Sequence, residues 1–199
     1  TSFEESGYDL KQLIRLIMTS RTYQLGSEPT ELNASAGKYY AFYHAKRMPA
    51  ESMLDAINTA TGTATKFKDL PPGTLAIELP DTNYPNYFLK TFGKPLRVSV
   101  CECERAPDEN LAQALHTLNG DTIAKKISDP QSHLGKLLTA EAPLEEIVSH
   151  IFMATLSRAA TPDEQVLCKQ IVSEAPTMKE GCEDILWALI NSKQFVYIQ

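Results

Sequence analysis

The sequence has little of what disulfide-stapled, membrane-spanning or nucleic-acid-binding proteins are built from. Four cysteines in 199 residues are too few to hold a fold by disulfides alone, and a chain of this length can bury a core without them. No apolar run reaches the length of about eighteen residues that a transmembrane helix needs, so we expect no membrane span. Basic residues number 19 against 25 acidic ones, so the general attraction to phosphate backbones is missing. We therefore expect an acidic globular protein that does not bind nucleic acid.

Several short motifs of known chemistry are also missing. The 9 glycines form no phosphate-binding loop, and the haem-attachment pattern Cys-x-x-Cys-His does not occur. His44, His116, His133 and His150 are scattered, and none lies in a metalloprotease or hydrolase motif. We therefore expect no metal site and no cofactor in this chain, and we interpret each histidine as a surface residue or a satisfied core residue.

Helical periodicity at both ends of the sequence predicts a mainly α fold. Apolar residues at helical spacing predict a helix over 9–20, and Met53, Leu54 and Ile57 predict a second helix that ends before Gly62. Capping-box patterns begin two later helices at Thr161 and Thr177. Downstream of Pro107, the predicted helices cover 111–118, 121–128, 131–139, 143–157, 162–174 and 178–192.

The middle of the chain lacks this periodicity. Prolines interrupt the segment 63–107, in which Leu75–Leu79 and Arg97–Cys103 are typical of short strands or extended arms. We predict a single helical domain over 1–199 with a long irregular insertion, and the apolar start suggests the C-terminal part of a larger domain and protein. Its parts are a helical segment 1–62, an irregular arm 63–107 and a helical segment 108–199.

The most unusual string in the sequence is Cys101-Glu102-Cys103-Glu104-Arg105. Two thiolates could bind a soft metal or act as a redox dithiol, and two carboxylates could perform acid–base chemistry on a glycan. We take Glu102, Glu104 and Arg105 as candidate catalytic residues, and Cys101 and Cys103 as candidate binding residues. The alternative is structural, with small buried cysteines and a Glu–Arg pair that fixes one loop.

Two other groups are candidate sites. Tyr39 and Tyr43 could stack on a sugar ring, although aromatic residues at this spacing also fill protein cores. Cys168 and Cys182 lie at equal distances from Ala175, where a helical hairpin would fold, so we predict that they are neighbours. They could form a disulfide or remain two separate core thiols.

Several strings that follow one another along nearly the whole chain carry a family resemblance. These strings are Gly7–Lys11, Thr19–Gln24, Arg47–Glu51, Leu54–Ile57, Phe92–Pro95, Cys101–Arg105, Leu111–His116, Leu118–Asp121, Ala154–Arg158, Thr161–Pro162 and Trp187–Phe195. Together they resemble the C-terminal portion of the domain of unknown function 1553, found in large planctomycete-type cytochrome-associated proteins. The resemblance implies an extracytoplasmic or periplasmic protein, haem c elsewhere in the parent protein, and the parent's other domains and a polysaccharide as partners.

On this basis we expect a non-catalytic or accessory helical domain of an exported, cytochrome-c-associated multidomain protein with a link to polysaccharide use. The alternative is a glycan-active enzyme domain, oxidative or hydrolytic, with its site around Cys101–Arg105. The two hypotheses differ in the surroundings of the carboxylates. Catalytic carboxylates open into a pocket, whereas structural carboxylates are covered by arginine partners.

Overall fold

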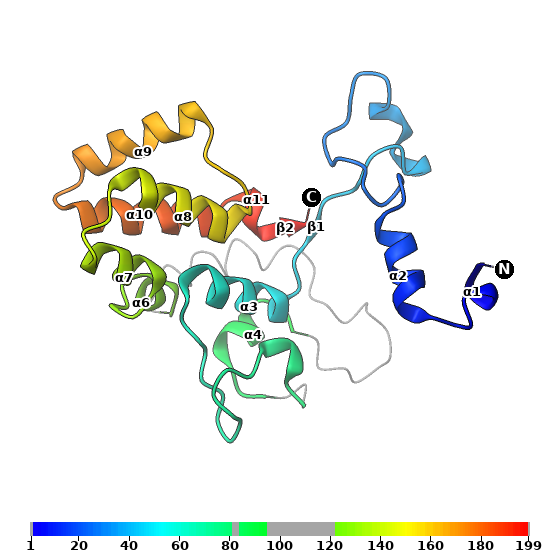
Figure 1. The fold of residues 1–199 in the computed structure, drawn as a ribbon, viewed down its shortest axis with the longest axis horizontal. Coiled ribbons are helices and arrows are strands. Elements are labelled where there is room, and N and C mark those ends of the chain that lie inside the picture. The colour runs from blue at the N-terminus through cyan, green and yellow to red at the C-terminus, as the bar shows by residue number, and fades with distance from the viewer. Residues whose placement is uncertain (1, 81–83, 95–121, 199) are drawn as a thin grey trace. The chain divides into compact units, whose positions relative to one another are not determined.

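The computed structural model is mainly helical, which confirms the predicted fold class (Figure 1). It describes residues 2–80, 84–94 and 122–198. The strand predicted at Arg97–Cys103 and the helix predicted over 111–118 lie outside these residues. The chain divides into two compact units, one formed by residues 1–47 with 197–199 and the other by residues 48–196. We describe each unit by itself.

The first unit contains a well-capped amphipathic helix. The Asp9 carboxylate accepts hydrogen bonds from the backbone amides of Lys11 and Gln12, at 2.9 and 3.1 Å, and so begins α2 close to the predicted start. A two-stranded antiparallel sheet pairs Lys46 with Ile198 and Arg47 with Tyr197. The elements are α1 (Ser2–Glu5), α2 (Leu10–Met18), η1 (Ala34–Tyr39), β1 (Lys46–Arg47) and β2 (Tyr197–Ile198).

The second unit begins with α3 (Ala50–Thr61), whose inward face was predicted correctly. Met53, Leu54 and Ile57 are all buried, and the helix ends where Gly62 adopts a left-handed conformation with φ of 69°. Glycine takes this conformation without the steric penalty of a Cβ, so it ends a helix readily.

The extended conformation predicted for Leu75–Leu79 is wrong. Residues Ala76–Glu78 form a 3-10 turn, η2, because the Asp55 carboxylate of α3 accepts from the Ala76 and Ile77 amides at 2.7 and 3.1 Å. The carboxylate thereby satisfies two backbone donors at the start of the turn. A short helix, α4 (Tyr87–Thr91), also lies inside the predicted irregular arm and buries Phe88 and Leu89.

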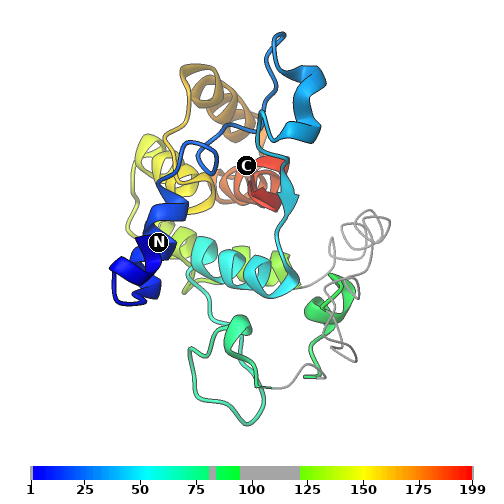
Figure 2. The same ribbon diagram turned by 90° about the vertical axis from the view of Figure 1, so that its right-hand side faces the viewer.

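Five further helices of the second unit form close to the positions that the sequence predicts, whereas the short helix Lys193–Val196 was not predicted. In Figures 1 and 2, α3 lies alongside α8, and α10 packs against both α8 and α9. Their contact faces form the core, where Ile147, Ile151 and Leu186 are buried. The helices are α6 (Thr122–Ile127), α7 (His133–Thr139), α8 (Leu144–Leu156), α9 (Pro162–Glu174), α10 (Met178–Ile190) and α11 (Lys193–Val196).

The first predicted capping box forms completely. Thr161 Oγ1 accepts from the Glu164 amide at 3.3 Å, while the Thr161 amide donates to Glu164 Oε2 at 2.8 Å. At the start of α10, Thr177 accepts from the Glu180 amide, which is the threonine half of the second predicted box. Both helices therefore begin at the predicted residues.

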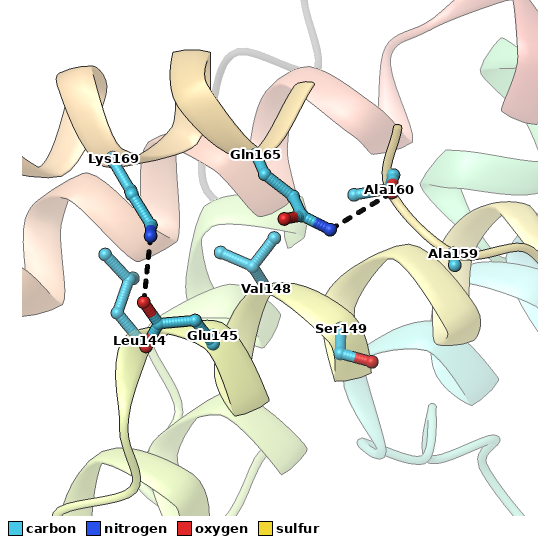
Figure 3. Close-up of a pocket in the computed structure, with 8 residues that line it drawn as sticks. All are labelled: Leu144, Glu145, Val148, Ser149, Ala159, Ala160, Gln165 and Lys169. Atoms are coloured by element: carbon cyan, nitrogen blue, oxygen red, sulfur yellow. Dashed lines mark hydrogen bonds and ion pairs between the residues drawn. The ribbon is translucent and has the colours of Figure 1, made fainter. Parts of the chain in front are cut away.

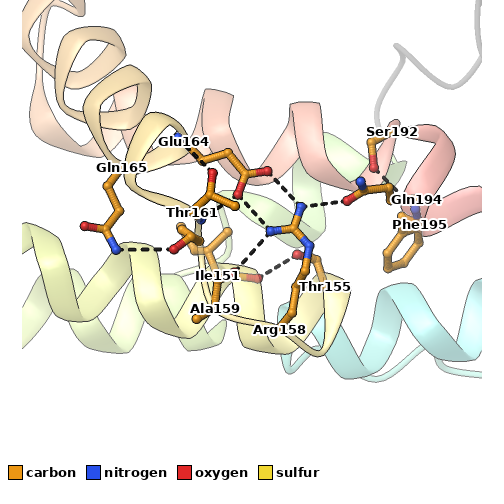
Figure 4. Close-up of polar contacts among 11 residues, drawn as sticks. Ile151, Thr155, Arg158, Ala159, Thr161, Glu164, Gln165, Ser192, Gln194 and Phe195 are labelled. Carbon is orange, nitrogen blue, oxygen red and sulfur yellow. Dashed lines mark hydrogen bonds and ion pairs between the residues drawn. The ribbon is translucent and has the colours of Figure 1, made fainter.

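An arginine network joins the α8–α9 turn to α11 (Figure 4). The Arg158 guanidinium donates to both carboxylate oxygens of Glu164 at 2.7 Å and to the side-chain oxygen of Gln194 at 2.8 Å. The hydrogen bond from Arg158 is the main reason that the pKa of Glu164 falls to about 2. Both side chains remain partly open to solvent, so this bidentate pair positions the turn more than it stabilises the fold.

The close approach of α9 and α10 requires a residue without a side chain at their contact. A Cβ at Gly181 would lie only 2.8 Å from the Cα of Val172, so α10 could not approach α9 this closely with any other residue there. The close contact of α9 with α10 forms the helical hairpin that the sequence predicts.

Among the described helices, none has the length and apolar character needed to cross a membrane.

Candidate functional site

The candidate residues of the cysteine string cannot be placed. Cys101, Glu102, Cys103, Glu104 and Arg105 lie outside the described residues. Their predicted catalytic and binding roles stay predictions, and so does the hypothesis of a glycan-active enzyme around them.

The aromatic candidates lie in a loop of the first unit that is braced by its own polar groups. The Tyr43 amide donates to the Gly26 carbonyl at 2.9 Å and closes the loop. Inside it, Asn33 Oδ1 accepts from the Thr30 amide at 2.7 Å, and Asn33 Nδ2 donates to the Ala41 carbonyl at 3.1 Å. We call residues 26–44 the tyrosine loop.

The two tyrosines that the sequence proposes as sugar-stacking residues differ in exposure. Tyr39 is 72% exposed at the end of η1, whereas Tyr43 is half-buried and its amide closes the loop. The Lys38 ammonium lies 4.9 Å from the centre of the Tyr39 ring, within the range of a cation–π interaction. Tyr39 therefore does not fill a core, and one of its ring faces is close to a cation.

Tyr40 is an exposed aromatic residue that the sequence analysis did not select. It is as exposed as Tyr39 and has a positive φ of 56°, a conformation that costs a non-glycine residue free energy. No signal in the sequence distinguished it from the other tyrosines of this group, because its exposure follows from the end of η1 and the left-handed backbone at this residue. The exposed pair in this loop is thus Tyr39 and Tyr40.

The apolar face of α2 is the second notable surface of the first unit. Leu10, Ile14 and Ile17 are 64%, 55% and 49% exposed, although helical periodicity alone would suggest that they face a core. Lys11 and Arg15 lie on the same helix and are also exposed. Within its own unit, α2 therefore leaves most of its apolar face uncovered.

A small hollow of about 80 Å³ lies between α8 and α9 (Figure 3). Lys169 Nζ lies 3.0 Å from a carboxylate oxygen of Glu145, and Gln165 donates to the Ala160 carbonyl at 3.3 Å. The hydrogen bond with Lys169 is the main cause of the lowered pKa of Glu145. Because the carboxylate and the ammonium are paired with each other and well exposed, we interpret the hollow as a helix–helix seam rather than a catalytic site.

Cys168 and Cys182 are both buried, and both are free thiols in the structure. Burial, followed by the neighbouring Cys168 thiol, raises the pKa of Cys182 to about 11, and burial also raises the pKa of Cys168. Each thiol therefore stays protonated and weakly nucleophilic at neutral pH. The disulfide between them stays a prediction, and we return to it in the Discussion.

No three histidine, cysteine, aspartate or glutamate side chains gather around a common point in the described part of the chain.

A family model described as "Protein of unknown function (DUF1553)" matches residues 1–72 and 76–172. Comparisons with curated proteins and with solved structures gave no significant match.

Proposed function

The chain belongs to the DUF1553 family of proteins of unknown function, and on that premise we propose that it is a non-catalytic, accessory helical domain of an exported, cytochrome-c-associated multidomain protein. Haem c would be carried by another domain of that protein. The accessory domain would act by docking, and its compartment would be extracytoplasmic.

The uncovered apolar face of α2 carries this proposal. Full burial of one leucine or isoleucine side chain is worth about 1.5–3 kcal/mol, and Leu10, Ile14 and Ile17 are each about half-exposed or more. A helix capped by Asp9 presents these side chains in a fixed arrangement. The occupant that we propose is an apolar surface of another domain of the same protein, with acidic side chains at its rim to meet Lys11 and Arg15.

Hydrogen exchange tests the docking of α2. We expect the amides of α2 to exchange at least about tenfold more slowly in the full-length protein than in the isolated chain, because a docked helix opens less often. The amides of α9 serve as the internal control and should exchange equally in both samples. Equal exchange of α2 in both proteins, or a gene that encodes this chain alone, would contradict the proposal.

A polysaccharide is the second partner that we propose, with the tyrosine loop as its contact surface. Apolar faces of sugar rings stack on exposed aromatic rings, and aromatic contacts of this kind are worth about 0.5–1.5 kcal/mol. We expect Tyr39→Ala to weaken binding by about twofold to tenfold, since it removes one exposed ring. Affinity electrophoresis in gels containing xylan, laminarin or carboxymethylcellulose measures this change.

Tyr23→Ala is the matched control for that measurement. Tyr23 is also an exposed tyrosine of the first unit, but it lies outside the tyrosine loop. Its replacement should leave the retardation unchanged. Identical mobility of the unmodified protein with and without every polysaccharide would rule out this ligand class while leaving the docking of α2 untouched.

A further inference from the structure

Two histidines of the second unit meet at the junction of α7, α8 and the end of α3. The ring centres of His133, the first residue of α7, and His150 on α8 lie 5.2 Å apart in an edge-to-face arrangement. A Cβ at Gly62 would lie 2.6 Å from the His133 ring, so this ring packs directly on the C-terminal end of α3. The pair thus joins three helices at one point.

One nitrogen of this pair is buried without a partner. His150 Nε2 is inaccessible to solvent and has no hydrogen-bond partner among the described residues. A buried polar atom without a partner costs free energy, and a buried positive charge costs more. Among the described residues, the junction therefore offers no hydrogen-bond acceptor to an N–H at this nitrogen.

Charged groups of both signs lie around the pair, and Lys136 is the one that lowers the pKa of His133. Lys136 lies on α7 itself, and Lys126 of α6 donates to the Thr63 carbonyl at 3.2 Å, one residue beyond Gly62. Acidic side chains lie at the edges of the junction: Asp129 faces Lys126, Glu146 lies exposed one turn before His150 on α8, and Glu183 lies with Lys179 beside Leu134 and Gly135 of α7.

We propose that His133 and His150 form an acid-sensitive latch that holds α7 against α8 and α3 when both rings are neutral, and that loosens α7 when the pair takes up a proton. This property goes beyond the docking function and does not depend on it. A protonated ring is more stable in water than in a buried site. Because His133 is part of α7, a helix of only seven residues, its movement toward water would displace α7.

The direction in which stability changes with pH follows from the pKa of His133. Burial lowers this pKa below the ordinary 6.5, and the neighbouring His150 and Lys136 lower it further. The unfolded chain therefore binds more protons than the folded chain as the pH falls below about 6.5. The contribution of the neutral pair to stability is present above this pH and is lost as the pH falls through the lower, folded pKa.

Hydrogen exchange at two pH values tests the latch. Between pH values of about 7.5 and 5.5, we expect the protection factors of the α7 amides to fall by about threefold to tenfold, after correction for intrinsic exchange, because one proton taken up at an ordinary pKa of 6.5 allows no more than about tenfold, while those of α10 change by less than about twofold. His133→Phe keeps a ring in the contact but cannot be protonated, so α7 should stay protected at both pH values. His44→Gln, in the first unit, should behave like the unmodified protein.

Two results would overturn the latch. One is unchanged protection of α7 in the unmodified protein between the two pH values. The other is an equal loss of protection in the His133→Phe variant, which would assign the effect to another group. If that variant does not fold, NMR titration of the unmodified protein decides: the α7 amide shifts must follow the midpoint of the His133 ring protons, and a different midpoint refutes the proposal.

Discussion

Replacement of Leu186 by alanine is expected to lower the free energy of unfolding by about 3–4 kcal/mol, because it leaves a cavity where α10 meets its neighbouring helices. Leu186 is 2% exposed, and α10 packs against both α8 and α9. Such a loss is a large part of the total stability of an ordinary domain, which is about 5–15 kcal/mol. Urea denaturation followed by far-UV circular dichroism measures it.

Leu167 on α9 provides the matched control, because the same chemical change is made on an exposed side. This residue is 54% exposed, so Leu167→Ala should cost less than about 0.5 kcal/mol. If the two variants lose equal stability, Leu186 is not a core residue and the packing of α10 described above is wrong.

The second large effect is expected from oxidation of Cys168 and Cys182. A disulfide between them closes a loop of about 15 residues and should raise the free energy of unfolding by roughly 3 kcal/mol. The two thiols would lose two electrons and two protons to oxidised glutathione, which is reduced in turn. Urea denaturation of the oxidised and the reduced protein measures the difference.

The control for the disulfide prediction is a cysteine variant, and thiol labelling supplies the result that would contradict the prediction. Cys168→Ala should abolish the difference between oxidised and reduced samples, since no intramolecular bond can form between the two positions. Both thiols of the unmodified protein should resist labelling after denaturation without a reductant. If a thiol reagent labels Cys168 and Cys182 in that sample, the bond did not form.

Most helices could be predicted because their signals are local. The capping box at Thr161 and the glycine at position 62 act on neighbouring backbone groups, and the observed α9 and α3 begin or end there. The turn at Ala76–Glu78 could not be predicted in this way. Its cause is the carboxylate of Asp55, which lies on α3 and far away in the sequence.

The candidate sites were predictable only in part, and the reasons are physical. Periodicity finds an apolar face on α2, but it cannot show whether another surface covers that face. Residue type suggests that Tyr39 and Tyr43 can stack on a sugar, but the hydrogen bonds of the loop decide which ring is exposed. His133 and His150 stand in no motif, so only the packing of α7 against α8 shows that they form a pair.

The pairing of β1 with β2 has a consequence for biosynthesis. Lys46 and Ile198 are neighbours in the sheet although most of the sequence separates them. The ribosome synthesises β1 first, and the strand must wait while α3 through α11 are made, because its partner does not yet exist. The helices of the second unit can fold during that interval from largely local signals. The sheet of the first unit must therefore form late, after most of the residues between its two strands have already folded.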